Sequence, residues 1–128
     1  MFTARPIKRE HDFMIDKIFA LSNSIRYVAR YDGDQLETKS KAGTVGASTS
    51  ETDRYEELLV NPTLLKLSSQ RGNIDCGGLR YVLVRYGNFF QFVLPTRAGH
   101  ISVCIESDAD PVEIGNRISA LVQSQCSL

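Results

Sequence analysis

The stretch LRYVLVRYGNFFQFVLPTRAGHISVCI, residues 79–105, decides the fold. Its aromatic and β-branched residues favour the extended, pleated backbone. The turn sequence Gly87-Asn88 and the loop-like run 95–99 divide it into three parts. The predicted strands are 79–86, 89–94 and 100–105. Strands joined by such short links pair as an antiparallel meander.

The middle strand of this stretch is apolar on both faces. Phe89, Phe90, Phe92, Val93 and Leu94 leave only one polar position in six. Such a strand belongs in a sheet that is covered on both sides. We expect the helices at the two ends of the chain to supply that cover.

A hairpin is predicted upstream. Residues 25–31 alternate in the manner of a strand and end at Asp32-Gly33-Asp34, where Asp and Gly tolerate the backbone of a tight turn. A second strand is expected over 35–41. Its only large apolar residue is Leu36, so this strand is predicted at the margin of the sheet.

Amphipathic helices are predicted near both ends of the chain. In the first, over 10–23, Met14 and Ile18 fall on one face, and the polar run 22–24 would end the helix. The last helix is expected over 111–124. Asp108 or Asp110 would cap it, and a proline at its first position suits a helix start.

The central helix is predicted over 51–69, following a loop at 42–50. Ser50 and Asp53 have the spacing of a capping box. Pro62 lies inside the segment and removes one backbone donor. We therefore expect a kink, or a second helix capped by Asn61, and Gly72 is the predicted C-terminal signal.

The element order is therefore α-β-β-α-β-β-β-α. It predicts an α+β fold with a five-stranded antiparallel sheet and helices on both faces. Residues 1–9 are expected to be a flexible lead-in, and 10–124 a single domain, a size that buries a core without disulfides.

Composition bounds the function. The 128 residues carry 15 basic and 15 acidic side chains, and this balance disfavours electrostatic binding to nucleic acid. No apolar run is long enough to enter a membrane as a span, and the charged N-terminal residues do not resemble a signal peptide. Three widely spaced cysteines, Cys76, Cys104 and Cys126, fit a reducing cytoplasm.

The segments IRYVARYDGDQL (25–36) and 77–122 resemble the roadblock / dynein light-chain family, a branch of the profilin-like folds. The long link and the proline within 42–62 depart from the family pattern. The resemblance implies a homodimer or heterodimer, in which two copies join through the third strand into one sheet with their central helices packed together. It also implies a scaffold or regulator of a small GTPase, or a motor light chain.

The resemblance also implies which residues form that interface. Two sets are candidates: Arg54, Tyr55, Leu58 and Leu59 on the central helix, and Tyr81, Leu83 and Arg85 on the third strand. The leucines fit a monomer core equally well. Tyr and Arg are enriched at binding hot spots, which favours an outward role for Tyr55 and Arg85.

Signals for catalysis are few, and we expect neither an enzyme nor a bound cofactor or metal. No phosphate-binding Gly-Lys-Ser/Thr loop, nucleophile elbow or zinc spacing occurs. Cys76, beside two glycines, is a possible reactive thiol but is favoured as a plain loop residue. His100 is expected at the surface or as a cap, and Cys104 as a small buried apolar residue. The acids Glu51, Asp53, Glu56 and Glu57 suit a helix first turn.

The alternative function is a small-molecule sensor of the PAS or GAF type. An aromatic set on one face of the sheet would line its pocket: Tyr27, Tyr31, Tyr81, Phe90 and Phe92. Aromatic residues on strands more often form ordinary core, and no convergent polar groups accompany them.

Overall fold

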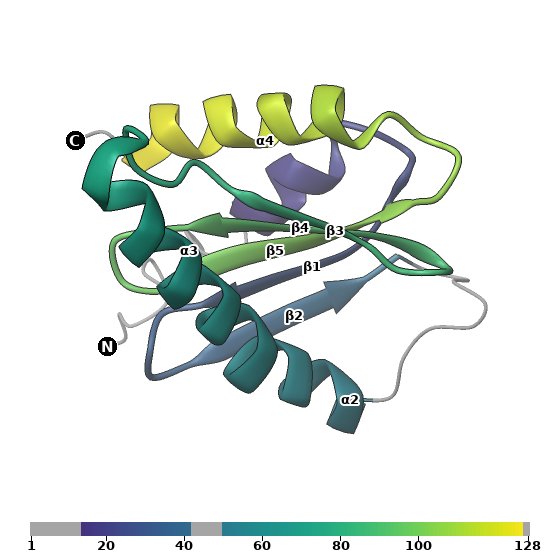
Figure 1. The fold of residues 1–128 in the computed structure, drawn as a ribbon. Coiled ribbons are helices and arrows are strands. Elements are labelled where there is room, and N and C mark those ends of the chain that lie inside the picture. The colour runs from purple at the N-terminus through teal and green to yellow at the C-terminus, as the bar shows by residue number, and fades with distance from the viewer. Residues whose placement is uncertain (1–13, 42–49, 127–128) are drawn as a thin grey trace, which may run out of the picture.

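The computed structural model describes residues 14–41 and 50–126, and the predicted element order is confirmed (Figure 1). Residues 14–19 form the first helix. The other elements are β1 (Ile25–Tyr31), β2 (Leu36–Ser40), α2 (Ser50–Tyr55), the π-helical turn η1 (Glu56–Val60), α3 (Asn61–Asp75), β3 (Val82–Arg85), β4 (Phe89–Pro95), β5 (His100–Glu106) and α4 (Pro111–Cys126). The predicted lead-in at 1–9, the start of the first helix and nearly all of the 42–50 loop lie outside the described residues.

All five strands form one antiparallel sheet in the order β2-β1-β5-β4-β3. The meander and the marginal place of β2 are therefore confirmed. β3 is shorter than predicted and begins at Val82, opposite Val93. Continuing that register would set Arg80 against Pro95, which has no N–H to donate to the ladder.

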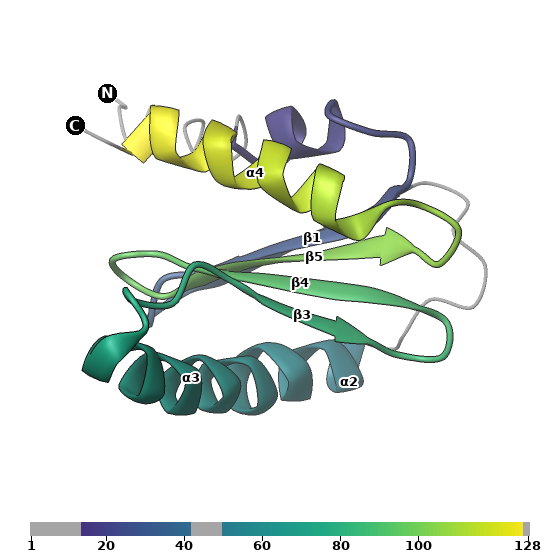
Figure 2. The same cartoon turned by 45° about the horizontal axis from the view of Figure 1, so that its top comes forward.

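Helices cover both faces of the sheet, as predicted, but their arrangement differs from the expected one. The first helix and α4 lie on the same face, and the continuous helix α2-η1-α3 covers the other (Figure 2). The expectation that the two terminal helices take opposite faces was wrong. Hydrophobic periodicity tells how apolar each face is, but it does not tell which helix packs against it.

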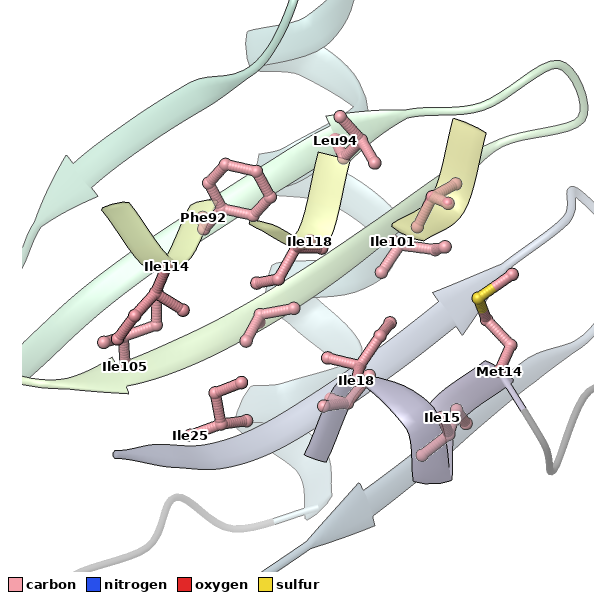
Figure 3. Close-up of a cluster of buried hydrophobic side chains, with 13 residues drawn as sticks. Met14, Ile15, Ile18, Ile25, Phe92, Leu94, Ile101, Ile105, Ile114 and Ile118 are labelled. Carbon is pink, nitrogen blue, oxygen red and sulfur yellow. The ribbon is translucent and has the colours of Figure 1, made fainter. Parts of the chain in front are cut away.

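The main core lies between the sheet and the two terminal helices (Figure 3). Ile18, Phe92, Val103 and Ile118 have no exposed surface. Gly115 of α4 lets this layer close, because a Cβ atom there would lie 2.6 Å from the Phe92 ring. The described helices include none that is both long enough and apolar enough to pass through a bilayer.

Two predicted local signals are confirmed. In the β1–β2 turn, Asp32 Oδ1 accepts hydrogen bonds from the amides of Asp34 and Gln35, and Gly33 has φ 97°. At the start of α4, Asp110 is the capping residue, since its Oδ1 accepts from the amides of Val112 and Glu113, both at 3.2 Å.

The central helix departs from its prediction. The helix neither breaks nor restarts at Pro62, which has no amide hydrogen to donate. It widens instead into the π-helical turn η1, in which the Asn61 amide bonds to Glu56 O, five residues back. Asn61 is therefore no cap. The helix continues to Asp75, past Gly72, whose carbonyl accepts the amides of Cys76 and Gly78. The first helix, by contrast, ends at residue 19, earlier than predicted.

Candidate interaction surface

The outer side of the central helix carries four exposed large apolar side chains among polar neighbours such as Thr63, Lys66 and Arg71. Tyr55 is 61% exposed, Leu59 57%, Leu67 61% and Ile74 75%. Among the described residues, the one other large apolar side chain with comparable exposure is Val112 on α4, which is 48% exposed. An apolar patch gathered on one element of a folded chain marks a surface for a partner.

The inner side of the same helix buries two polar residues. Glu57 and Asn61 have no exposed surface, and beyond them the helix buries Leu65 and Gly72. The helix therefore lacks the clean division of an ordinary surface helix, which turns its apolar stripe inward and its polar residues outward. Since charged residues are almost never fully buried unless paired, Glu57 requires partners inside.

Glu57 has four such partners. Its Oε1 atom lies 2.7 Å from His100 Nε2 and accepts from Asn61 Nδ2 at 3.0 Å. Its Oε2 atom accepts from Ser102 Oγ at 2.5 Å and from Tyr27 OH at 3.2 Å. The carboxylate therefore ties the helix to β1 and β5, and it satisfies polar side chains that would otherwise be buried alone.

His100 is 1% exposed, so the expectation of a surface or capping histidine was wrong. Ser102, His100 and Glu57 are buried together, and these residue types also form the catalytic triad of serine hydrolases. In such a triad the serine bonds to the histidine. Here Ser102 and His100 bind different oxygens of the same carboxylate, and no hydrogen bond between these two described side chains is found. The geometry is that of a structural contact that fixes the central helix to the sheet, and we call Glu57 with its four partners the anchor.

A small cavity of about 210 Å³ with acidic side chains in its wall lies beside this anchor. Its walls include Asp53, Glu56 and Tyr86. Burial raises the pKa of both carboxyl groups, and the nearby Glu57 raises them further, while the Tyr86 hydrogen bond partly opposes the shift at Glu56. Burial and Glu56 raise the pKa of Tyr86 to about 12. The acids Asp53 and Glu56 therefore do more than favour the start of the helix, because they also line this cavity.

The two edges of the sheet differ in character. β2, with the sequence LETKS, carries charged and polar residues along one edge, which protects it from pairing. β3, with the sequence VLVR, forms the other edge, and in the described part of the chain no strand pairs with its outer side. A short apolar edge of this kind can accept a strand from another copy.

Side chains of β3 alternate between the two faces of the sheet. Leu83 pairs with Phe92 and Val84 with Gln91, so Leu83 faces α4 and Val84 faces the central helix. Val82 shares the face of Val84. Tyr81 and Leu83 pack against the main core, and Arg85 stacks over Phe90 at 4.8 Å.

The sequence-predicted candidates are therefore divided by the sheet. Arg54, Tyr55 and Leu59 are exposed or partly exposed on the central helix, and Leu58 is half-buried there. Tyr81, Leu83 and Arg85 lie on the α4 side. The half-buried residues that continue the helix side onto β3 are Val82 and Val84, which the sequence did not single out because all of 81–84 is apolar.

The central helix contacts the chain just after and just before β3. At one end Tyr86 OH donates to Glu56 Oε2 at 3.0 Å. At the other, a Cβ on Gly72 would lie 3.3 Å from the backbone of Gly78 and Leu79. Figure 2 shows the helix beneath this part of the sheet. We group the exposed apolar residues of the helix with the two β3 residues on the same side of the sheet and call them the helix–edge surface, which comprises Tyr55, Leu59, Leu67, Ile74, Val82 and Val84.

The aromatic set proposed for a sensor pocket is not on one face. Tyr27 belongs to the small cluster under the central helix, and Tyr31 lies 5.6 Å from the His100 ring beside it. Tyr81, Phe90 and Phe92 lie on the α4 side. These residues therefore do not line a single pocket.

Cys76 and Cys104 are free thiols in contrasting settings. Cys76 is exposed and donates to Asp75 Oδ1 at 3.4 Å. Cys104 is buried, as predicted, and donates to Gln91 Oε1 at 3.0 Å. Burial, reinforced by Glu57 and Asp53, raises the pKa of the Cys104 thiol, which keeps it unreactive.

No protein-family model matches the sequence, and no curated protein matches it either. Solved structures do. Gliding protein MglB from Thermus thermophilus has a TM-score of 0.64 and 13% identity, with 99% of this chain and 94% of that chain covered. MglB in a tetrameric arrangement has a TM-score of 0.58 and 12% identity, with 99% and 93% covered.

MglC from Myxococcus xanthus is also similar, with a TM-score of 0.51, 10% identity, and 90% of this chain and 99% of that chain covered. Each likeness extends over nearly the whole of both chains. At these identities it shows the fold alone. It confirms the roadblock-type α+β fold that the segments 25–36 and 77–122 predicted.

Proposed function

We propose that the protein is a non-catalytic interaction module that works as a homodimer, joined through the helix–edge surface, and that it is a scaffold or regulator of a small GTPase. The observation that carries the dimer is the burial pattern of the central helix, which buries Glu57 and Asn61 and leaves Tyr55, Leu59, Leu67 and Ile74 exposed. A partner that covers this side removes apolar surface from water.

The size of that driving force is considerable. Fully burying one leucine side chain is worth about 1.5–3 kcal/mol. Leu59 and Leu67 are more than half exposed, and Tyr55 adds a larger aromatic surface. β3 adds main-chain hydrogen bonds and the apolar side chains Val82 and Val84. Association costs translational and rotational freedom, which such a surface can offset only if helix and edge act together.

The GTPase partner rests on the fold. The resemblance to roadblock domains implies proteins that scaffold or regulate small GTPases. The similar structure of MglB in a tetrameric arrangement supports association between copies in this fold. Regulation here would act by surface complementarity, and no arginine is assigned a role in nucleotide hydrolysis.

We also propose a cytoplasmic location. Cys76 and Cys104 are free thiols, and Cys76 is exposed. An exposed free thiol persists best in a reducing compartment.

The dimer is tested by solution mass, measured with light scattering after size exclusion over a range of concentrations. The chain mass is 14.3 kDa. A species of twice that mass, present down to low micromolar concentration, supports the proposal. A monomer at every concentration contradicts the homodimer.

The GTPase partner is tested separately, with purified small GTPases of the source organism. Each is loaded with GDP or with a non-hydrolysable GTP analogue, and binding is followed by biolayer interferometry. Binding that depends on the bound nucleotide supports a regulator. Binding to none of them, or equal binding in both states, contradicts it, whatever the outcome for the dimer.

A further inference from the structure

A second feature of the molecule lies at one end of the sheet, away from the helix–edge surface. The α3–β3 connection, the β4–β5 turn and the last turns of α4 enclose an open cleft of about 570 Å³. Small-molecule sites typically have volumes of about 300–1,000 Å³. Its apolar walls come from Leu79, Leu94 and Val122.

Three arginines line this cleft, each from a different segment. Arg30 comes from β1, Arg80 from the α3–β3 connection and Arg97 from the β4–β5 turn. Among the described residues, no aspartate or glutamate lines it. In a chain with equal numbers of acids and bases, this is a local concentration of positive charge.

The three guanidinium groups have no ion pair within the part of the chain that the structure describes. Other arginines are paired there: Arg26 with Glu106 at 3.3 Å, and Arg117 with Glu113 at 2.8 Å. Guanidinium groups that converge on one cleft without a carboxylate between them are available to an anionic ligand.

We propose that this cleft binds a small organic phosphate. A guanidinium presents a rigid fork of N–H donors that matches phosphate oxygens two at a time. A single carboxylate would neutralise one of three charges. A phosphoryl group carries about −1.5 to −2 charges at neutral pH and three acceptor oxygens. The leucines and Val122 would then contact the organic part of the ligand.

The side chains of Ser119 and Gln123 on α4 complete the wall opposite the turn. A hydroxyl and an amide give the ligand neutral donors and acceptors beside the three cations. An apolar wall with a few convergent polar groups is the usual build of a small-molecule site. The cleft shares no residue with the helix–edge surface, so the two proposals stand or fall independently.

The test uses isothermal titration calorimetry on the full chain in a phosphate-free, low-salt buffer, with pyrophosphate and citrate as probes. The cleft variant is R80Q/R97Q, which changes two exposed residues. The control is K66Q/R71Q, two exposed residues on α3 whose loss changes the net charge by the same amount. Melting curves confirm that each variant folds, and R97Q alone replaces the pair if it does not.

We expect pyrophosphate to bind wild type and the control alike, and to bind the cleft variant at least about tenfold more weakly, since each lost charge-assisted hydrogen bond costs about that factor. Citrate should bind much more weakly than pyrophosphate. Absence of pyrophosphate binding, or equal weakening in both variants, overturns the site. Citrate binding as tight as pyrophosphate binding overturns the assignment to phosphate.

Discussion

Glu57 and His100 are 43 residues apart in the sequence, and in the folded chain their Oε1 and Nε2 atoms lie 2.7 Å apart with neither residue more than 1% exposed. This contact joins the central helix to the middle of the sheet. A buried acid of this kind stabilises the fold only while its partners are intact, because removing one side of a buried polar pair leaves the other desolvated and alone.

Replacement of Glu57 by glutamine is therefore expected to destabilise the protein by about 3 kcal/mol. Each carboxylate oxygen accepts two hydrogen bonds, whereas glutamine has one acceptor oxygen, so two of the four buried contacts must reverse their direction or be lost. The free energy of unfolding is measured in urea. The control is Glu51→Gln, on the exposed first turn of the same helix, with a change of no more than about 0.5 kcal/mol. Equal losses in both variants would contradict the anchor.

Glu56→Gln should have the opposite sign at neutral pH. Burial, followed by the charges of Glu57 and Asp53, raises the pKa of Glu56 above its ordinary value of 4.5 despite the Tyr86 hydrogen bond. A folded-state pKa that is raised means that ionisation costs stability, so this cost is absent at low pH and grows as the pH rises through the folded pKa. The amide oxygen can still accept from Tyr86 OH.

The variant should thus be more stable than wild type by about 0.5 kcal/mol at pH 7, a small figure because solvent screens this partly exposed group. The two proteins should converge below pH 4.5, the ordinary value for a glutamate. Melting temperatures from acidic to neutral pH give the difference curve. A difference that is constant over this range would show that ionisation of Glu56 is not its cause.

Gly115→Ala should destabilise the protein although alanine is the better helix former. The new methyl group would lie 2.6 Å from Cε1 of Phe92, a ring with no exposed surface to move into. Overpacking of this kind costs about 1–3 kcal/mol. Asn116→Ala, one position along on the exposed side of α4, is the control and should be neutral or slightly stabilising in urea unfolding. A more stable Gly115→Ala would refute the close contact.

Leu67→Glu should weaken the proposed dimer by about 2 kcal/mol, the cost typical of an interface hot spot. Leu67 is 61% exposed, so the stability of the monomer should change little. Val112→Glu provides the match, since Val112 is 48% exposed on α4, on the opposite side of the sheet. Sedimentation equilibrium gives both dissociation constants. Similar constants for the two variants would place the interface elsewhere.

Val84→Lys tests the edge strand. A lysine on a strand edge discourages pairing with another chain, and Val84 is the half-buried β3 residue that faces the central helix. Thr38→Lys introduces the same charge on the exposed edge β2. We expect the first variant to be monomeric by light scattering at concentrations where wild type and the second are dimeric. Loss of the dimer in both would point to non-specific charge repulsion.

The strands were predictable because alternation and turn chemistry are local. β1 has the predicted bounds, and the turn at Gly33 needs a positive φ that the sequence Asp-Gly-Asp supplies. The π-helical turn was not predictable. Pro62 removes a donor in any helix, and the local sequence does not say whether the helix then breaks or widens. Here it widens, and Glu57 in the widened turn binds side chains of β1 and β5.

The buried anchor was missed for a related reason. Ile101, Val103 and Ile105 mark one face of β5, and His100, Ser102 and Cys104 share the other. In a strand buried on both sides, that polar face calls for a polar partner on the covering helix. Glu57 and Asn61 have the spacing to supply such a partner. Which helix packs against β5, however, depends on the tertiary fold and cannot be predicted from a local sequence pattern.

The unequal edges of the sheet set a limit on how far association can proceed. A sheet that receives a neighbour at both edges would let copies add one after another without end, as in a fibre. Here β3 is receptive and β2 presents Glu37, Thr38 and Lys39. Two copies that meet through β3, as proposed, would leave only the polar and charged β2 edges outward. Growth of the sheet would then stop at the pair, so the difference between the two edges would prevent polymerisation.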